Sequence, residues 1–387
     1  MMNPFNYSYP VNVYFGEGAA AKNMSAELSK VGENVLLAYG GGSIKKNGVY
    51  DEIIKILKDA GKNIIEFSGI MSNPTYDKVQ EGAKLAKDNN IDFILAVGGG
   101  SVIDCCKIVS AQANLSEDIW EFEYSKGKRP IEFIPMGAVV TAFGTGAEMN
   151  NGAVITNTEK MMKSALWGAF YSFAVLDPAY TMSMPMGQVI SGAFDSLSHS
   201  METYMGSPRD TNLSDEINVA TQRNIIRNIR TTLKNPDDVH ARSELMWAAA
   251  MAENGILKIG KATDFQCHMV EHQLGAYTDC NHGQGLAVLH PVLYKHYLPE
   301  ATQQFAQLAT EVWGIDPKGK YESELAEEFI EALSNFIREI GLPTTFSEMG
   351  IGDETDFEAI AKSTIRTGGC VKKFTDEELL EVLNECR

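Results

Sequence analysis

Two glycine triplets, each placed between an apolar run and a helical pattern, constrain the fold of this chain more than any other feature. The triplet Gly40–Gly42 follows the run at 34–39, and the triplet Gly98–Gly100 follows the run at 91–97. The other elements predicted in this half are strands at 12–15, 63–67, 132–136 and 173–177 and helices at 49–60, 76–89 and 102–113. Strands that alternate with helices in this way predict a parallel sheet with helices on both faces.

The position of the two triplets suits a bound nucleotide. Glycines have no Cβ, so the backbone can approach a pyrophosphate, whose charge the free N–H groups of a helix N-terminus can hold. Ligands of open parallel sheets bind at the carboxyl ends of the strands, where both triplets lie. Neither triplet matches the G-x-G-x-x-G fingerprint, so each alone is better explained as a tight structural turn. The two together predict a dinucleotide site.

A loop rich in hydroxyls and glycine follows the strand predicted at 132–136. It spans residues 141–150 and reads TAFGTGAEMN. Such a loop is either a surface turn or a lid over the phosphates or the nicotinamide of a cofactor.

The character of the sequence changes near Pro185, after which strand-like runs disappear. Helical patterns then follow at 187–205, 213–233, 239–256, 265–274, 284–297, 302–312, 325–340 and 375–386. We therefore expect an α/β dinucleotide-binding domain at 1–184 and an all-α metal-binding domain at 185–387. A chain of 387 residues is long enough for two cores.

Histidines and one carboxylate recur at helical spacing in the second half. Asp195 and His199 lie four residues apart, as do His268 and His272, so each pair shares one face of a helix, and His282 follows in a glycine-flanked turn. A carboxylate with several imidazoles is a ligand set for a divalent transition metal. A closed structural zinc site is the alternative, but such sites usually favour cysteines, so a catalytic centre is preferred.

Charge and cysteine content exclude several classes of partner. The formal net charge is −18, which repels phosphate backbones and anionic lipid surfaces, so we expect no nucleic-acid and no membrane partner. The chain has neither a long apolar run nor a signal-peptide pattern at its start. Its six cysteines form no C-x-x-C pair, which suits a reducing compartment. A cytoplasmic location is expected.

Together these motifs resemble the iron-containing, or group III, alcohol dehydrogenase family. The resemblance spans essentially the full chain and is close to the branch of NADPH-dependent butanol dehydrogenases and broad-range aldehyde reductases. It implies a dehydroquinate synthase-like fold with the site in the cleft between the two domains, and commonly a homodimer. The motifs that carry it are GGGSVID at 98–104, the loop at 141–150, D-x-x-x-H at 195–199, H-x-x-x-H at 268–272 and HGQG at 282–285.

The resemblance also implies roles for single residues. The implied metal ligands are Asp195, His199, His268 and His282, and His272 is placed near the nicotinamide and the substrate without ligating. The implied cofactor contacts are Gly98, Gly99, Gly100, Ser101, Asp104, Thr141 and Thr145. The family usually shows T-G-S-E where this chain has Ala147 before Glu148, so the hydroxyl at that position is missing.

The first glycine turn predicts a preference for NADP(H) over NAD(H). An NAD site places a carboxylate beside the adenosine ribose, but the turn at 39–43 offers none, and two lysines follow it. A small turn with a hydroxyl and nearby ammonium groups suits a 2′-phosphate. The residues expected to contact this phosphate are Gly41, Gly42, Ser43 and Lys46.

We therefore expect a metal-dependent oxidoreductase that transfers hydride between NADP(H) and a primary alcohol or aldehyde such as butanol or butyraldehyde. The metal is Fe²⁺ or Zn²⁺, between which the sequence does not distinguish. The alternatives are an NAD-dependent polyol dehydrogenase, a dehydroquinate-synthase-like lyase, and a nucleotide- or metal-binding protein without turnover. A lyase needs several basic side chains for its substrate, and the second half lacks such a cluster.

Overall fold

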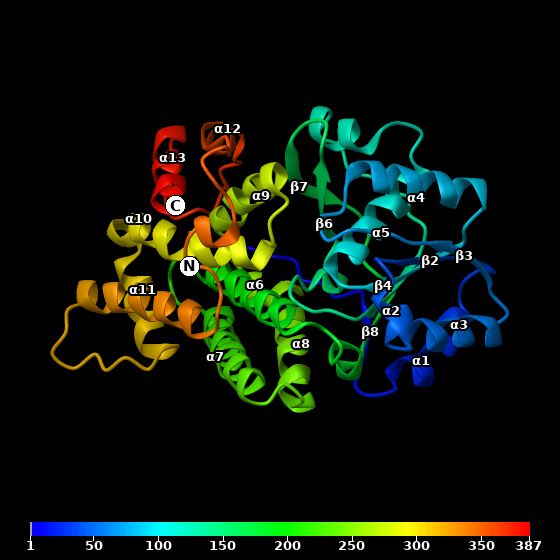
Figure 1. The fold of residues 1–387 in the computed structure, drawn as a ribbon, viewed down its shortest axis with the longest axis horizontal. Coiled ribbons are helices and arrows are strands. Elements are labelled where there is room, and N and C mark those ends of the chain that lie inside the picture. Colours follow the sequence, from blue (N-terminus) through cyan, green and yellow to red (C-terminus); the bar gives the residue numbers. More distant parts are fainter. Residues whose placement is uncertain (1) are drawn as a thin grey trace. The chain divides into compact units, whose positions relative to one another are not determined.

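The computed structural model describes residues 2–387, which form two compact units (Figure 1). One unit spans Ser8–Pro185, and the other comprises Met186–Arg387 with the N-terminal residues up to Tyr7. The predicted boundary at 184/185 lies one residue from this division. The N-terminal residues differ from the predicted partition, since the Asn3 N–H donates to the Gly260 carbonyl at 3.0 Å within the helical unit.

The first unit is built on a six-stranded parallel sheet in the order β1-β8-β5-β4-β2-β3. The strands are β1 (Asn12–Phe15), β2 (Asn34–Tyr39), β3 (Asn63–Phe67), β4 (Phe93–Gly98), β5 (Met136–Val140) and β8 (Phe173–Leu176). The four central strands are buried almost throughout, as expected of strands covered on both faces. The α/β fold class predicted for this half is confirmed.

Helices cover both faces of this sheet (Figure 1). They are α1 (Ala19–Leu28), α2 (Ser43–Lys46), α3 (Val49–Asp59), α4 (Tyr76–Asp88) and α5 (Gly100–Asn114). Helix α1 packs against α3 on one face, and α4 packs against α5 on the other. Helix α3 is amphipathic: its buried residues Val49, Ile53 and Leu57 recur every four positions and so lie on one face.

One predicted strand is misplaced. The structure has no strand at 132–135; β5 begins at Met136 and continues to Val140. Ile131 is 88% exposed, and Pro135 has no N–H to donate to a neighbouring strand. The run that follows is fully buried between β4 and β8, and it leads directly into the loop at 141–150.

A two-stranded antiparallel hairpin was not expected from the sequence. It consists of β6 (Gly152–Asn157) and β7 (Met162–Trp167), and it packs against α5. Short helical turns complete the chain at Glu121–Ser125, Ala147–Met149, Pro178–Thr181, Ile256–Lys258 and Ser347–Met349.

The second unit is helical, as predicted. Its helices are α6 (Met186–Tyr204), α7 (Leu213–Lys234), α8 (Val239–Glu253), α9 (Gln266–Thr278), α10 (His282–Glu311), α11 (Glu322–Glu339), α12 (Phe357–Ser363) and α13 (Asp376–Glu385). Two helices predicted at 284–297 and 302–312 are joined as α10, with non-helical backbone at Ala301 just after Pro299. None of the described helices has the length and apolarity needed to cross a membrane.

Candidate functional site

Helix α6 supplies the first part of the candidate metal centre. Asp195 and His199 lie one turn apart on it, and Glu202 lies in the following turn on the same side. The exposed fractions of the Asp195 and Glu202 residues are 3% and 1%. Helix α6 therefore brings two carboxylates and one imidazole into the interior of the helical unit.

Helix α9 supplies two more imidazoles. It begins after Phe265, whose backbone is in the left-handed region, and Asp264 accepts a hydrogen bond from the Gln266 N–H at 3.2 Å. His268 and His272 follow one turn apart, and both are buried. The start of α9 thus fixes where these two rings emerge.

The N-terminus of α10 supplies His282. The Asn281 side chain caps this helix by accepting from the Gln284 N–H at 3.1 Å, and the Ser191 hydroxyl on α6 donates to the same Asn281 oxygen. A Cβ at Gly283 would lie 2.2 Å from the Ser191 carbonyl oxygen, so only glycine permits this approach of α10 to α6. The close contact holds His282 against the Asp195 side of α6.

These three helices bring four predicted ligands to one point. Asp195 Oδ1 lies 3.4 Å from His268 Nε2, 3.4 Å from His282 Nε2 and 3.7 Å from His199 Nδ1. The His199 and His268 rings stack with their centroids 4.5 Å apart. The sequence therefore identified four side chains that converge, although their role as ligands stays a prediction.

His272 also lies beside this cluster. Its ring centroid is 6.1 Å from that of His268 and 5.7 Å from that of His282. A second group of three potential ligand atoms, from Glu271, His272 and His282, lies next to the first and shares His282 with it. Because His282 belongs to both groups, we treat them as one cluster around a single candidate metal centre.

Two buried glutamates behind the imidazoles were missed in the sequence. Glu202 pairs with Nδ1 of His268, and Glu271 pairs with Nδ1 of His282. Glu202 also accepts from the Cys267 N–H at 2.6 Å. A carboxylate on one ring nitrogen fixes the tautomer and turns the other nitrogen toward a metal. The spacing offered a signal, since Glu202 lies seven residues after Asp195 on α6.

The electrostatics of the cluster fit a cation. Burial raises the pKa of Asp195, but His199 and His282 outweigh this effect and hold that pKa well below its usual range. Burial lowers the pKa of His268, but Glu202 and Asp195 outweigh it and raise this pKa to about 10. The buried carboxylates of Asp195 and Glu202 thus favour a positive charge at the cluster, either on an imidazole or on a bound cation.

The unsatisfied polar atoms of the cluster point to the same conclusion. Asp195 Oδ1, His199 Nδ1 and His268 Nε2 are buried and have no hydrogen-bond partner within residues 2–387. Buried polar atoms normally have partners, so three such atoms facing one point fit the coordination of a metal ion. An oxygen and imidazole nitrogens suit a divalent transition metal. The side chain of His282 is 23% exposed, so the cluster is accessible to solvent at this residue.

The second glycine triplet and the loop at 141–150 form one surface in the first unit. A Cβ at Gly100 would lie 2.2 Å from the Thr145 hydroxyl oxygen, and a Cβ at Gly99 would lie 3.0 Å from the Ala142 Cβ. The Thr141 N–H donates to the Gly98 carbonyl at 2.9 Å. The triplet therefore also serves to seat the loop on the N-terminus of α5.

Two other predicted cofactor contacts have partners inside the protein. The Ser101 hydroxyl donates to the Ser72 carbonyl. Asp104 is 7% exposed, and its Oδ2 accepts from the Val154 N–H of the hairpin at 2.9 Å. This anchoring of the hairpin by Asp104 was not foreseen from the sequence.

The residues of the first glycine turn that are predicted to contact the 2′-phosphate face solvent. Gly41, Ser43 and Lys46 are exposed, and Gly42 is half-buried. Beside the turn, Glu66 accepts from the Tyr39 and Tyr50 hydroxyls. Lys45 lies 5.0 Å and 4.5 Å from the centroids of those two tyrosine rings.

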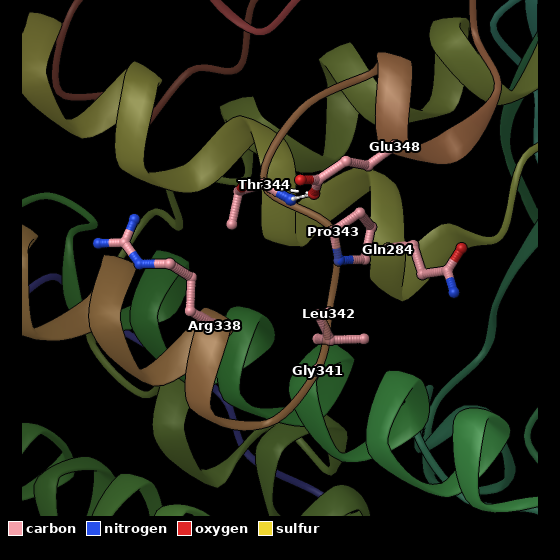
Figure 2. Close-up of a pocket in the computed structure, with 7 residues that line it drawn as sticks. All are labelled: Gln284, Arg338, Gly341, Leu342, Pro343, Thr344 and Glu348. Carbon is pink, nitrogen blue, oxygen red and sulfur yellow. Dashed lines mark hydrogen bonds between the residues drawn. The ribbon is translucent and has the colours of Figure 1, made fainter.

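A separate cavity of about 450 Å³ lies in the helical unit (Figure 2). Figure 2 shows Arg338 and Gln284 on opposite sides of it, and Glu348 accepts from the Thr344 N–H at 2.7 Å. Its lining residues are Gln284, Arg338, Gly341, Leu342, Pro343, Thr344 and Glu348. None of them is a predicted site residue, so this cavity is distinct from the metal cluster.

Comparisons with known proteins agree over the whole chain. Residues 10–178 match the family described as "Iron-containing alcohol dehydrogenase", and residues 189–386 match "Fe-containing alcohol dehydrogenase family, C-terminal". NADH-dependent butanol dehydrogenase A of Clostridium acetobutylicum is 36% identical over 99% of this chain and 100% of its own length. The NADPH-dependent aldehyde reductase YqhD of Escherichia coli is 36% identical over 93% of this chain and 92% of its own.

A solved structure extends this agreement to the fold. The crystal structure of NADH-dependent butanol dehydrogenase A from Thermotoga maritima superposes with a TM-score of 0.93 at 33% identity. The match covers 100% of this chain and 99% of the other.

Proposed function

Because this chain belongs to the iron-containing alcohol dehydrogenase family, we propose that it interconverts primary alcohols and aldehydes by hydride transfer with a nicotinamide cofactor. One observation carries the proposal. Asp195 Oδ1 lies within 3.4 to 3.7 Å of three imidazole nitrogens, in a buried cluster whose rings are held by further carboxylates. Such a cluster is costly to bury unless a cation compensates it.

The residues that would hold the metal are Asp195, His199, His268 and His282, and iron(II) is the proposed ion because the family is named for iron. A bound divalent ion would supply Lewis acidity, which polarises a substrate carbonyl so that its carbon accepts hydride more readily. Glu202 and Glu271 keep His268 and His282 in the orientation that directs Nε2 to the centre.

His272 is the proposed proton-transfer residue. It is 5% exposed and lies beside the ligand cluster. Imidazole exchanges protons near neutral pH, so Nδ1 or Nε2 of His272 can donate a proton to the substrate oxygen after hydride addition, which completes the alcohol. In the oxidation direction the same ring accepts the proton of the alcohol.

The nucleotide is proposed to lie on the second glycine turn. Gly98–Ser101 would present backbone N–H groups at the start of α5 to the pyrophosphate, with Thr141 and Thr145 on the loop beside it. Asp104 is also proposed to contact the nucleotide. Its Oδ2 accepts a hydrogen bond from the Val154 N–H of the hairpin.

An NADP(H) preference is proposed within the NAD(P)-dependent family. Ser43 and Lys46 are exposed at the first turn, where they can reach a 2′-phosphate. Glu66 is the carboxylate that would favour NAD(H), but its oxygens already accept from two tyrosines. Named relatives use either cofactor. Replacing Lys46 with Ala should raise KM for NADPH and leave KM for NADH unchanged.

Butyraldehyde and butanol are the proposed test substrates, since butanol dehydrogenases are among the relatives. The experiment follows NADPH oxidation by anaerobically purified protein loaded with iron(II), loaded with zinc, or stripped of metal. We expect turnover with the loaded protein and none with the stripped protein. Silence with every aldehyde and alcohol would favour a binding protein without turnover, and preferential oxidation of polyols with NAD would favour a polyol dehydrogenase.

A pair of histidine variants makes this experiment specific. His268→Ala should lose both the bound metal and turnover, while circular dichroism shows that the helices remain. His240→Ala removes an exposed histidine on α8, and it should keep both. Full turnover by a metal-free His268→Ala protein would contradict the proposal.

We also propose a homodimer in a reducing cytoplasm. The six cysteines are free thiols, which supports the compartment. Light scattering coupled to size-exclusion chromatography measures the oligomeric state directly.

A further inference from the structure

Lys107 is a charged residue in the interior of the first unit. It lies on α5 two turns after the glycine triplet, and its exposed fraction is 0%. Lysine is almost never fully buried unless its ammonium group has partners. The position of Lys107 therefore needs an explanation in terms of what it holds.

The partners of the ammonium group lie on the segment that joins the loop at 141–150 to the hairpin. Lys107 Nζ donates to Asn150 Oδ1 at 3.0 Å and to the Gly152 carbonyl oxygen. Asp104, one turn earlier on α5, lies 3.6 Å from the same nitrogen and accepts from the Val154 N–H. Hydrogen bonds that involve a charged group are stronger than neutral ones, so Lys107 and Asp104 bind this segment tightly to α5.

The other end of the same loop rests on the glycine triplet. Thr145 and Ala142 occupy the space that side chains at Gly100 and Gly99 would need. The loop is thus fixed to α5 at two places, at the helix N-terminus and at Lys107. Its end near Asn150 is also internally tied, since Asn150 Oδ1 accepts from the Gly152 N–H at 3.1 Å.

We propose that Lys107 is a positioning residue for the cofactor: it fixes the loop at 141–150 over the N-terminus of α5 and so sets the affinity for the nicotinamide nucleotide. Lys107 itself is fully buried and acts through the loop. This inference rests on the proposed function, in which the triplet and the loop hold the nucleotide. A loop held in its binding conformation loses less freedom when the ligand binds, which increases affinity.

Ser110 provides a matched control on the same helix. It is also fully buried, and its hydroxyl donates to the Ile134 carbonyl at 2.7 Å, on the segment before β5. Ser110→Ala therefore removes a buried polar anchor of α5 that does not reach the loop. A general loosening of α5 would affect both variants, whereas the proposed role is confined to Lys107.

The experiment measures the dissociation constants of NADPH and NADH for full-length protein from the fluorescence of the reduced nicotinamide. Lys107→Met should weaken binding of the preferred cofactor about tenfold, in the range seen for coupling between separate sites. It should raise KM for the cofactor more than it lowers kcat, and leave the metal content unchanged. Ser110→Ala should keep the wild-type dissociation constant.

If Lys107→Met does not fold, a second pair of variants at Asn150 tests the same positioning role. Asn150→Ala removes one of the two hydrogen-bond acceptors of the ammonium group, the one on the loop, and should weaken cofactor binding. Asn150→Asp keeps an acceptor there and should retain binding. Hydrogen exchange of the amides at 146–154 should be faster in Asn150→Ala alone.

The outcomes separate this inference from the proposed function. Wild-type affinity in folded Lys107→Met, or in Asn150→Ala, would overturn the positioning role while the proposed function stands. Equal weakening in Ser110→Ala would also overturn it. Wild-type protein that binds neither NADPH nor NADH would overturn the proposed function, and this inference with it.

Discussion

Single carboxylates decide how the imidazoles of the metal cluster are oriented. Glu202 and Glu271 are fully buried, and each pairs with Nδ1 of one histidine. Without them each ring could rotate or adopt the other tautomer, and Nε2 would no longer face Asp195. Helical spacing places Glu202 on the same side of α6 as Asp195, but the pairings themselves depend on how α6, α9 and α10 meet.

Glu202→Gln should weaken metal binding by about 10- to 100-fold, the usual cost of losing a partner of this kind. The amide retains the shape of the side chain but loses its charge. Competition with a chromogenic chelator measures the affinity. Ser200→Ala removes a neighbouring buried hydroxyl that bonds only the Ser196 carbonyl in the described contacts, and it should keep wild-type affinity. Equal metal affinity in Glu202→Gln would show that Glu202 does not support His268.

Glu148 should make the stability of the protein depend on pH. Burial raises the pKa of this carboxyl from 4.5 to about 7. The folded protein therefore binds this proton more tightly than the unfolded chain does. Its contribution to the free energy of unfolding is present below about pH 4.5 and is lost as the pH rises to about 7, and it amounts to at most about 3 kcal/mol.

Denaturant titrations between pH 5 and 8 measure this contribution. Glu148→Gln should flatten the fall in stability relative to the wild type. Glu159→Gln replaces an exposed glutamate in the hairpin turn and should leave the slope unchanged. A wild-type slope in Glu148→Gln would mean that this carboxyl titrates alike in the folded and unfolded states.

At the scale of elements, periodicity and composition located most helices and strands because the pattern is local. The apolar run of β4 and the four-residue spacing of α3 identify those elements without tertiary information. The hairpin β6–β7 lacked such a signal. Its anchoring depends on Asp104 and Lys107, which lie about fifty residues earlier in the chain. The strand at 132–136 was misplaced because short apolar runs do not define their own ends.

The approach of α10 to α6 should tolerate no side chain at Gly283. A Cβ there would meet the Ser191 carbonyl oxygen at 2.2 Å, so the start of α10 must move away. Overpacking of this kind typically costs about 1 to 3 kcal/mol. Because His282 is the preceding residue, Gly283→Ala should also lose metal, as measured by elemental analysis.

Gly187 is the matched control for this substitution. It lies in the first turn of α6, and a Cβ there would meet nothing within 4 Å. Gly187→Ala should keep the metal and keep or slightly raise the melting temperature. Full metal occupancy in Gly283→Ala would contradict the proposed seating of α10.

At the scale of the whole molecule, the sequence indicated the two-part organisation because the change from alternating strands to continuous helices is visible along the chain. The family resemblance implied a metal site of Asp195, His199, His268 and His282, and the structure brings these four side chains together. Their role as ligands stays a prediction. The sequence could not show that Asp104 anchors the hairpin or that Lys107 is buried, because those facts depend on packing between distant segments.

Metal binding should stabilise the helical unit as a whole. The four proposed ligands come from α6, α9 and α10, so the ion joins three helices. Free metal at 100 times its dissociation constant should add about 2.7 kcal/mol to the free energy of unfolding. Calorimetry with and without a chelator measures the shift, and an unchanged transition would mean that the folded protein binds no metal.

Anomalous diffraction at the iron absorption edge, from crystals grown anaerobically with iron(II), shows directly whether the four side chains hold one iron ion. We expect one strong peak per chain within coordinating distance of Asp195, His199, His268 and His282 together. A peak elsewhere, or no peak in crystals of protein that turns over aldehyde, would contradict it.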